Sequence, residues 1–382
     1  MSLQETTLQP AMIASGEAEA GGVLTIDLAA IAANWKRLYS MTVPVESAAV
    51  VKADAYGCGI ERVVPVLKKV GCRTFFVADI AEGRRVRAAA PEAVIYVLNG
   101  LMPSTARAFA DVNLRPVINS PTELAEWDSF IAANSWDGGA ALHIDTGMNR
   151  LGLTPEEAVA IAPRIQSGTH GFKLLMSHFA CAETPDHPMN DRQIRLFREI
   201  RILFRGVPSS LANSAGIFLG GTAHCDLVRP GIALFGGNPI PGQKNVMRPV
   251  VELKGRITQV RQIKKGDTVG YGASWTAARP SRLAIIAVGY GDGYFRSAAA
   301  GKGKAPANVI IAGKPCPLIG RISMDLLAVD VTDLPGNAAR RGEFATLIGS
   351  GIDVDEFGAA CGTIGYEVLT NLGRRYHRHY RD

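Results

Sequence analysis

The feature that most constrains the fold is a regular alternation of short apolar runs and longer helix-like segments between residues 22 and 235. The runs are rich in β-branched residues and almost continuously apolar, which is typical of strands buried on both faces of a parallel sheet. Eight strand–helix units in about 210 residues favour a closed (β/α)8 barrel of the TIM type, and an open doubly wound sheet is the alternative. The eight runs lie at 47–54, 74–79, 93–99, 114–119, 140–145, 172–179, 209–214 and 225–236.

The segments between these runs carry the marks of helices. The clearest ones lie at 61–71, 120–133 and 188–204. Several of the segments begin with Ser, Thr or Asp, whose side chains accept hydrogen bonds from the free N–H groups at a helix start.

The pattern changes after residues 241–250, where short alternating strands and turns such as KKGDTVG and AGKP predict a second, mostly β domain. Ahead of the barrel lies a polar lead-in that lacks the basic and apolar regions of a signal peptide and could be disordered. We therefore expect a lead-in at 1–21, a barrel at 22–243 and a β-domain at 244–382.

Composition narrows the function classes. No apolar stretch reaches the roughly 18 residues of a membrane-spanning helix, so no membrane partner is expected. The six cysteines are scattered without a C-x-x-C pair, which favours a reduced, cytoplasmic protein over a disulfide scaffold. Much of the net charge of +6 lies in the C-terminal RRYHRHYRD, which is interpreted as a solvated basic tail rather than a basic nucleic-acid-binding face, so no nucleic-acid partner is expected either.

Polar side chains follow five of the apolar runs, at the point where each run ends. In a barrel of this kind the carboxyl ends of the strands meet at one mouth, where functional groups gather. One such residue alone would be an ordinary hydrogen-bonded core residue, but five ends with the same pattern predict a site. The residues are Lys52, Asp145, Asn149, Arg150, His178, Asn213, Ser214 and Arg229.

Two of these ends favour a phosphate. Loops after the seventh and eighth strands of such barrels often bind one, and here they are ANSAG (212–216) and RPGIA (229–233). Lys52 follows a run of apolar residues, and burial would free its amine as a nucleophile. A lysine, a phosphate cradle and no metal-site spacing, even in HFACAETPDHP (178–188), together suggest pyridoxal phosphate.

Several motifs, in order and over most of the chain, resemble those of the alanine racemase family, whose members join a pyridoxal-phosphate barrel to a β-domain. The match begins near Leu24 and continues to the C-terminus. The motifs are AVVKADAYGCG (49–59), HIDTGMNRLG (143–152), SHFACAE (177–183), NSAG (213–216), VRPGIALFG (228–236), GYGASW (270–275), VGYGDGY (288–294), GRISMD (320–325) and GYEVL (365–369).

The resemblance implies a role for each matching position. Lys52 resembles the Schiff-base lysine and one catalytic base, and Tyr271 resembles the opposing base, supplied by the partner subunit of a homodimer. Arg229 resembles the residue that faces the pyridine nitrogen. Further positions that resemble cofactor contacts are Tyr56, Arg150, His178, Asn213, Ser214, Gly231, Ile232 and Tyr366, and those that resemble substrate contacts are Arg150, Tyr290 and Met324.

These roles imply an isomerase that interconverts L-alanine and D-alanine. Two bases on opposite faces of the external aldimine would remove and return the proton of Cα. The product would supply D-alanine for peptidoglycan or serve alanine catabolism. The alternatives are a racemase of broader specificity and a pyridoxal-phosphate protein without catalysis, although the large β-domain argues against the second.

Arginine opposite the pyridine nitrogen separates this chain from decarboxylases of similar layout, which would carry an acid there. A guanidinium can only donate a hydrogen bond, so the nitrogen must stay unprotonated. That arrangement weakens the electron sink and should suppress transamination.

One position departs from the family pattern. Where many relatives carry a carbamylated lysine that holds the arginine of this motif, the chain has His143. An imidazole supplies no negative charge. Arg150 is then expected to be held by a bound anion such as chloride or by another acceptor, or else His143 is an ordinary hydrogen-bonded core residue.

Overall fold

The computed structural model describes residues 16–166, 171–301 and 305–382, and the chain divides into two compact units. The barrel unit consists of Leu28–Arg248. The β unit combines the chain up to Asp27 with Pro249–Asp382. Of the expected lead-in, residues 1–15 lie outside the described residues, and a short helical turn occupies 16–19.

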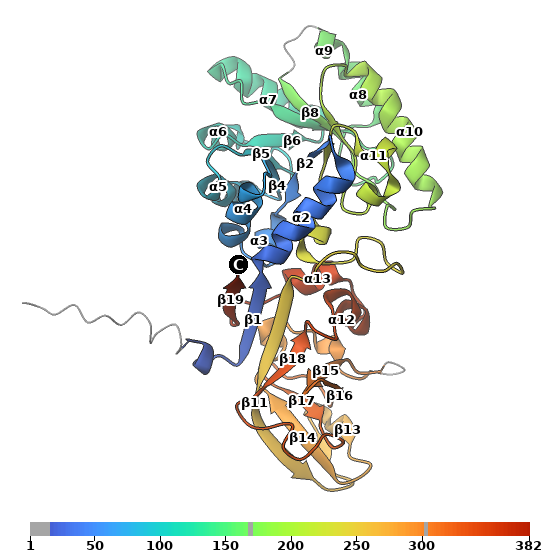
Figure 1. Ribbon diagram of the computed structural model, residues 1–382. Coiled ribbons are helices and arrows are strands. Elements are labelled where there is room, and N and C mark those ends of the chain that lie inside the picture. Colours follow the sequence, from blue (N-terminus) through green and yellow to red (C-terminus); the bar gives the residue numbers. More distant parts are fainter. Residues whose placement is uncertain (1–15, 167–170, 302–304) are drawn as a thin grey trace, which may run out of the picture. The chain divides into compact units, whose positions relative to one another are not determined.

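The barrel unit is built on parallel strands in the order β3-β4-β5-β6-β7-β8-β9. Figure 1 labels β4, β5, β6 and β8 among them. Two further strands, β2 and β10, pair with each other in parallel. The Asp226 N–H donates to the Ser209 carbonyl at 2.9 Å and the Val50 N–H donates to the Pro230 carbonyl at 2.9 Å, so β10 joins β9 to β2–β3 and the ring closes. The strands are β2 Glu46–Ser47, β3 Ala49–Val50, β4 Thr74–Val77, β5 Val94–Val97, β6 Arg115–Ile118, β7 Ala140–His143, β8 Phe172–Met176, β9 Ser209–Ser210 and β10 Leu227–Val228.

All eight expected strand positions are occupied, with β2 and β3 sharing the first, and the predicted barrel is confirmed. The strands are shorter than the apolar runs because the chain turns into loops as soon as each run leaves the core. Side chains on both faces of the strands are buried: Phe75, Phe76, Ile95, Leu142 and Leu175 are fully buried.

Helices connect the strands, and the three expected from sequence appear as α4, α7 and α10. Their caps follow the sequence signals: Ser120 accepts from the Glu123 N–H at the start of α7, and Thr154 and Glu157 form a reciprocal capping box on α8. Within the described residues no helix is long and apolar enough to cross a bilayer. The helices of this unit are α2 Leu28–Thr42, α3 Lys52–Tyr56, α4 Ile60–Lys69, α5 Ile80–Ala89, α6 Ala106–Asp111, α7 Pro121–Asn134, α8 Pro155–Ile161, α9 Pro163–Gln166, α10 Pro188–Leu203 and α11 Gly221–His224, with the 3-10 turns η1 Gly216–Leu219 and η2 Ile232–Phe235.

The β unit is an eight-stranded sheet in the order β14-β17-β16-β15-β18-β11-β1-β19, and it curls so that β14 also pairs with β11. The mostly β domain expected from sequence is confirmed. The unit contains β1 Gly22–Asp27, β11 Val251–Ile263, β12 Thr268–Val269, β13 Trp275–Thr276, β14 Ser281–Ile286, β15 Asn308–Ile311, β16 Lys314–Ile319, β17 Leu327–Asp330, β18 Phe344–Ile348 and β19 His377–Arg381, with helices α12 Val354–Cys361 and α13 Gly365–Thr370 and the 3-10 turns η3 Tyr271–Ala273, η4 Tyr290–Asp292 and η5 Arg296–Ala298.

The first strand lies in a different unit from the one expected. The sequence division gave Gly22–Asp27 to the barrel, whereas β1 pairs antiparallel with β11 and parallel with β19 (Figure 1). The division at 243–244 likewise differs from the structural one at Arg248. The sequence of a single strand does not indicate which sheet it joins, because its partner in β11 lies more than 200 residues away.

Replacing Ile26 by alanine should therefore destabilise the β unit. Ile26 is fully buried, and truncation of a buried isoleucine costs about 2–5 kcal/mol of unfolding free energy. Hydrogen exchange should accelerate in β11 and β19 before it does in β4–β8, while Thr25→Ala on the other face of β1 should change little. Faster exchange confined to the barrel strands would contradict the assignment of β1.

Candidate active site

The predicted site residues of the barrel unit lie beyond the carboxyl ends of its strands. Lys52 begins α3 directly after β3, His178 follows β8 and Arg229 follows β10. The Arg229 guanidinium lies 3.3 Å from the imidazole Nδ1 of His178. The charges of Arg150 and Lys52 both depress the pKa of His178. The strand ends therefore converge on one mouth, as the sequence pattern predicts.

Arg229 is the most constrained cation of the site. Its side chain belongs to a residue only 3% exposed, and it donates to the Ser210 hydroxyl, to the Ser177 carbonyl at 2.5 Å and to the Leu211 carbonyl at 3.4 Å. No carboxylate pairs with it among the described residues. Burial lowers its pKa to about 10, so it remains a cation at neutral pH. A buried cation surrounded only by neutral acceptors favours an electron-rich or anionic partner.

His178 is held as a neutral imidazole. Because a guanidinium can only donate, the Nδ1 atom facing Arg229 must accept, which leaves the ring proton on Nε2. Burial and the neighbouring Arg229 hold the pKa of His178 well below its usual value. The ring therefore offers one acceptor and one donor and adds no further cation to the mouth.

Gln193, which sequence reasoning missed, supports this arrangement from α10. Its amide is completely buried; its oxygen accepts from the Ala180 N–H at 2.9 Å, and its nitrogen donates to the His178 carbonyl at 2.9 Å and to the Thr146 hydroxyl at 3.0 Å. Thr146 in turn shares a 2.7 Å hydrogen bond with the Ser177 hydroxyl. One side chain thus connects the loops after β7 and β8.

Lys52 has the features of a reactive amine. Burial lowers its pKa, and the positive charge of Arg150 lowers it further. The carboxylate of Glu82 acts in the opposite direction. The neutral, nucleophilic form of the amine is thereby more accessible than in a solvent-exposed lysine.

The two loops expected to bind a phosphate come together. The Ser214 hydroxyl accepts from the Gly231 N–H at 2.8 Å and from the Ala233 N–H at 3.3 Å, which joins the loop after β9 to the loop after β10. In the described part of the chain, the backbone N–H groups of Ser214 and Ile232 donate to no protein acceptor. Free N–H groups in two joined loops of the barrel mouth fit a phosphate.

Gly231 is required at its position. A Cβ atom there would lie 2.3 Å from the hydroxyl oxygen of Tyr56, which is far inside van der Waals contact. The Tyr56 ring stacks on Phe235 of η2, with ring centroids 4.7 Å apart. Tyr56 is therefore held against the same loop as Ile232, and its hydroxyl reaches the cradle.

Asn213 has a structural explanation. Its side-chain oxygen accepts from the Gly216 N–H at 2.8 Å and so caps the start of η1. The contact orients the loop that carries Ser214. A direct contact of Asn213 with a cofactor stays a prediction.

His143 has a protein partner. It is 8% exposed, and its Nδ1 lies 2.8 Å from the Asn119 side-chain oxygen. The Asn119 amide nitrogen donates to the Val117 carbonyl at 2.8 Å, so its oxygen faces the imidazole and Nδ1 must donate. Burial and the Arg229 charge lower the pKa of His143 to about 4. The expected core hydrogen bond is present, while the bound anion near Arg150 stays a prediction.

The segment 178–188, which superficially resembles a metal site, has other uses. His178 bonds to Arg229, and His187 caps α10 by accepting from the Met189 N–H at 3.2 Å. Within the described residues no group of three or more His, Cys, Asp or Glu side chains is placed to hold a metal ion.

Four predicted residues belong to the β unit, and all four are exposed: Tyr271 by 70%, Met324 by 54%, Tyr290 by 43% and Tyr366 by 42%. Single exposed apolar side chains are common on protein surfaces, so this exposure leaves the four side chains available to a partner without identifying one.

Three of the motifs of the β unit converge. The Tyr290 N–H donates to the Ser323 carbonyl at 3.1 Å, and the Gly291 N–H donates to the Met324 carbonyl at 2.8 Å. The turn that carries Tyr271 packs against Arg321, because a Cβ on Gly272 would lie 3.0 Å from that guanidinium. Arg375, missed by the sequence analysis, joins the same region through ion pairs to Asp292 and Asp325 at 2.9 and 2.8 Å.

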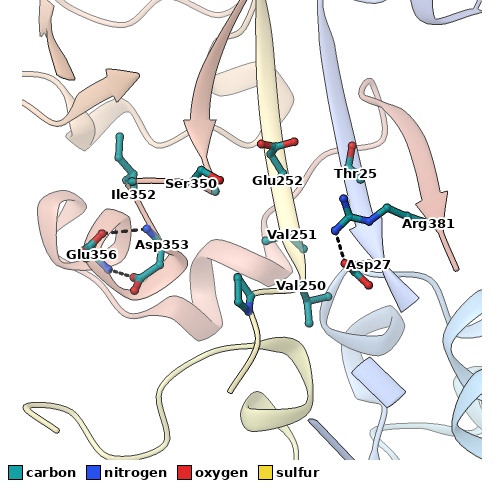
Figure 2. A pocket seen from close by; sticks show the side chains of 13 residues that line it. Thr25, Asp27, Val250, Val251, Glu252, Ser350, Ile352, Asp353, Glu356 and Arg381 are labelled. Atoms are coloured by element: carbon teal, nitrogen blue, oxygen red, sulfur yellow. Dashed lines mark hydrogen bonds and ion pairs between the residues drawn. The ribbon is translucent and has the colours of Figure 1, made fainter. Parts of the chain in front are cut away.

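A pocket of 470 Å³ also opens in the β unit, and none of the predicted site residues lines it (Figure 2). Its carboxylates already have partners. Asp27 pairs with Arg381, and Asp353 and Glu356 form the reciprocal capping box of α12. Its acidic groups therefore serve the fold.

Comparison with known proteins gives one consistent result. Residues 26–239 match the family model described as alanine racemase, N-terminal domain, and residues 250–380 match the one described as alanine racemase, C-terminal domain. A Methylobacterium sp. (strain 4-46) protein named alanine racemase is 54% identical over 362 residues, covering 95% of this chain and 98% of that protein. An Agrobacterium fabrum protein named biosynthetic alanine racemase is 46% identical over 364 residues, covering 94% and 93%. The crystal structure of alanine racemase from Bartonella henselae with covalently bound pyridoxal phosphate has a TM-score of 0.90 at 36% identity, covering 94% of this chain and 99% of that one.

The buried state of His143 should appear in the pH dependence of stability. The unfolded chain takes up a proton near pH 6.5 that the folded imidazole accepts only near pH 4, so stability falls as the pH falls through this window. Between pH 7 and pH 5 the wild type should lose about 2 kcal/mol more than His143→Gln does. Urea denaturation at the two pH values measures this, with the exposed His379→Gln as the control. Equal losses in wild type and His143→Gln would refute the assignment.

Proposed function

The chain belongs to the alanine racemase family, and on that premise we propose that it interconverts L-alanine and D-alanine with pyridoxal phosphate as its cofactor. The observation that carries the proposal is the buried, acid-free Arg229 beside a lysine whose pKa is lowered by burial. A racemase of broader specificity on the same fold is the alternative.

The residues of the barrel mouth fit the cofactor. The free N–H groups of Ser214 and Ile232 and the hydroxyl of Tyr56 would hold the phosphate, together with Gly231, while a contact with Tyr366 of the β unit stays a prediction. Arg229 would donate to the ring nitrogen, since its Nε–H is not used by a protein acceptor in the described residues. When bound, pyridoxal phosphate withdraws electrons from the substrate Cα and so makes its proton removable.

Two bases are needed, because inversion removes the proton from one face of Cα and returns it to the other. We assign them to Lys52 and Tyr271. The lowered pKa of Lys52 supports its role, since the amine must be neutral to accept a proton. His178 would assist by staying neutral, which avoids adding a further positive charge beside Lys52.

The exposure of Tyr271 supports a site shared between two subunits. A catalytic tyrosine must be shielded from water to be effective, yet 70% of this residue is exposed in the single chain. We propose that a homodimer places Tyr271 and Met324 of one subunit at the barrel mouth of the other. In the described part of the chain the Met324 N–H has no protein acceptor and would hold the substrate carboxylate, with Arg150 and Tyr290 as further contacts.

The size of two side chains favours alanine over larger substrates. Tyr366 and Met324 are bulky, and both would crowd any substrate side chain beyond a methyl group. Single-turnover rates on alanine, serine and lysine separate an alanine racemase from a broader enzyme.

We also propose a biological role and a location for the protein. The D-alanine formed would serve peptidoglycan synthesis or alanine catabolism, and a deletion strain that requires D-alanine would distinguish the first from the second. A cytoplasmic location is supported by the cysteines, all six of which are free thiols.

Chiral analysis of L-alanine incubated with cofactor-loaded protein should show D-alanine accumulating to an equal mixture. Tyr271→Phe should retain the cofactor's absorbance and its link to Lys52 but lose about a hundredfold or more of the turnover, because one of two bases is missing. If the cofactor-loaded wild type does not interconvert L-alanine and D-alanine, the protein only binds the cofactor. Near-normal turnover of Tyr271→Phe in both directions would show that Tyr271 is not one of the bases.

Mixing two inactive variants tests the shared site. Lys52→Ala and Tyr271→Phe chains should each be inactive, but half of randomly formed dimers combine both. One of the two sites in such a hybrid has both wild-type bases, so about a quarter of the wild-type activity should return. No recovery after verified subunit exchange would place both bases on one chain.

A further inference from the structure

The lysine of the candidate site introduces a strained turn. The four residues after Lys52 are not glycines, yet Ala53, Asp54, Ala55 and Tyr56 have φ angles of 53°, 56°, 53° and 53°. They form one turn of left-handed helix, in which the Gly57 N–H donates to the Ala53 carbonyl at 2.8 Å. Each such residue costs about 1–2 kcal/mol, so neighbouring groups must hold the turn in place.

Glu82 of α5 holds it. One carboxylate oxygen accepts from the Asp54 N–H at 2.9 Å, inside the strained turn. The other accepts from the Ala78 N–H at 2.9 Å, directly after β4. An ionised carboxylate is acceptor-only, so it suits two facing N–H groups in a way that an amide side chain does not.

A second carboxylate in the barrel joins two loops in a similar way, although both N–H groups there donate to the same oxygen. Glu123, in the same position of α7, accepts from the Asn119 N–H at 3.0 Å and from the Leu101 N–H at 3.2 Å, and so joins the loops after β6 and β5. A carboxylate that accepts from two loops is therefore a structural feature that occurs twice in this barrel. Glu82 differs from Glu123 because one of its two N–H donors belongs to the left-handed turn beside Lys52.

The other charged side chains that hold the turn are more exposed, and the Tyr56 ring adds a stacking contact with Phe235. Asp54 accepts from the Ile60 N–H at 3.1 Å and pairs with Arg85 at 2.5 Å. Arg85 also pairs with Glu61 at 2.6 Å, and these three side chains are 39–58% exposed, where ion pairs contribute little. Glu82 is therefore the principal anchor.

We propose that Glu82 is a positioning residue whose carboxylate fixes the left-handed turn and thereby sets the placement of the Lys52 amine and the Tyr56 hydroxyl. The inference rests on the proposed function, because it concerns the lysine of that same site.

The charges around Lys52 give this role a measurable consequence. Arg150 from the loop after β7 lowers the pKa of Lys52, Glu82 from α5 raises it, and His178 after β8 is itself held neutral. Asp54 belongs to the same turn and is paired with Arg85. Glu82 is thus the anion that offsets the effect of Arg150, and removing its charge should lower the pKa of Lys52 further.

The test uses the full chain freed of cofactor. Competitive acetylation of Lys52 across a pH series, measured by mass spectrometry, reports the protonation of its amine without requiring catalysis. In Glu82→Gln the midpoint should move to lower pH, and amide hydrogen exchange in 53–57 should accelerate. Two variants serve as controls: Glu123→Gln, which removes the similar carboxylate contacts elsewhere in the barrel, and Glu61→Gln. Both should leave the Lys52 midpoint at the wild-type value. An unchanged midpoint and unchanged exchange in folded Glu82→Gln would overturn the proposal.

Activity gives an independent arm with the loaded enzyme. In Glu82→Gln kcat should fall by about a hundredfold, as expected for misplacement of a reacting group, with a smaller change in KM. If Glu82→Gln does not fold, Glu82→Asp replaces it, because it keeps the charge but is too short to reach both N–H groups. Glu82→Asp should lose kcat and keep a Lys52 midpoint near the wild-type value, and wild-type kcat there would overturn the proposal. The acetylation result stands even if the wild type does not racemise alanine, so the two proposals can fail separately.

Discussion

A guanidinium buried without a countercharge is the constraint on which the candidate site depends. Arg229 is surrounded by carbonyl and hydroxyl oxygens from the ends of β8 and β9 and by one neutral imidazole. Each of these acceptors must be in register for the cation to be tolerated, because an unpaired buried charge is among the costliest defects a fold can carry. Gln193 contributes by fixing the loop of His178, and the result is a mouth whose cations are arranged for an anion before one arrives.

Much of the fold follows from local pattern. The continuous apolar runs specify the eight barrel positions because strands buried on both faces need no polar alternation. The helix starts also follow from local pattern, because Ser120 and Thr154 are residue types that cap helices. The residues at the strand ends could be identified for the same reason, since polar groups that follow a buried run have only the mouth to occupy.

Contacts between distant segments could not be predicted from the sequence. No local pattern indicates the partners of β1 or the bond from the Asp54 N–H to Glu82. The left-handed turn after Lys52 contains none of the glycines that usually indicate such a turn in a sequence. Gln193 has the appearance of a surface residue on a helix until its burial is known. In each case the missing information is which loops become neighbours once the barrel closes.

The position of β1 has a consequence for synthesis on the ribosome. The strand is made before the barrel, but both of its neighbours follow it by more than 200 residues. The barrel can close while β1 is still without either neighbour, since all of its own strands precede residue 230. During translation this apolar strand therefore stays unpaired while the entire barrel is synthesised, and in this interval the nascent chain is most exposed to wrong pairing and to chaperones.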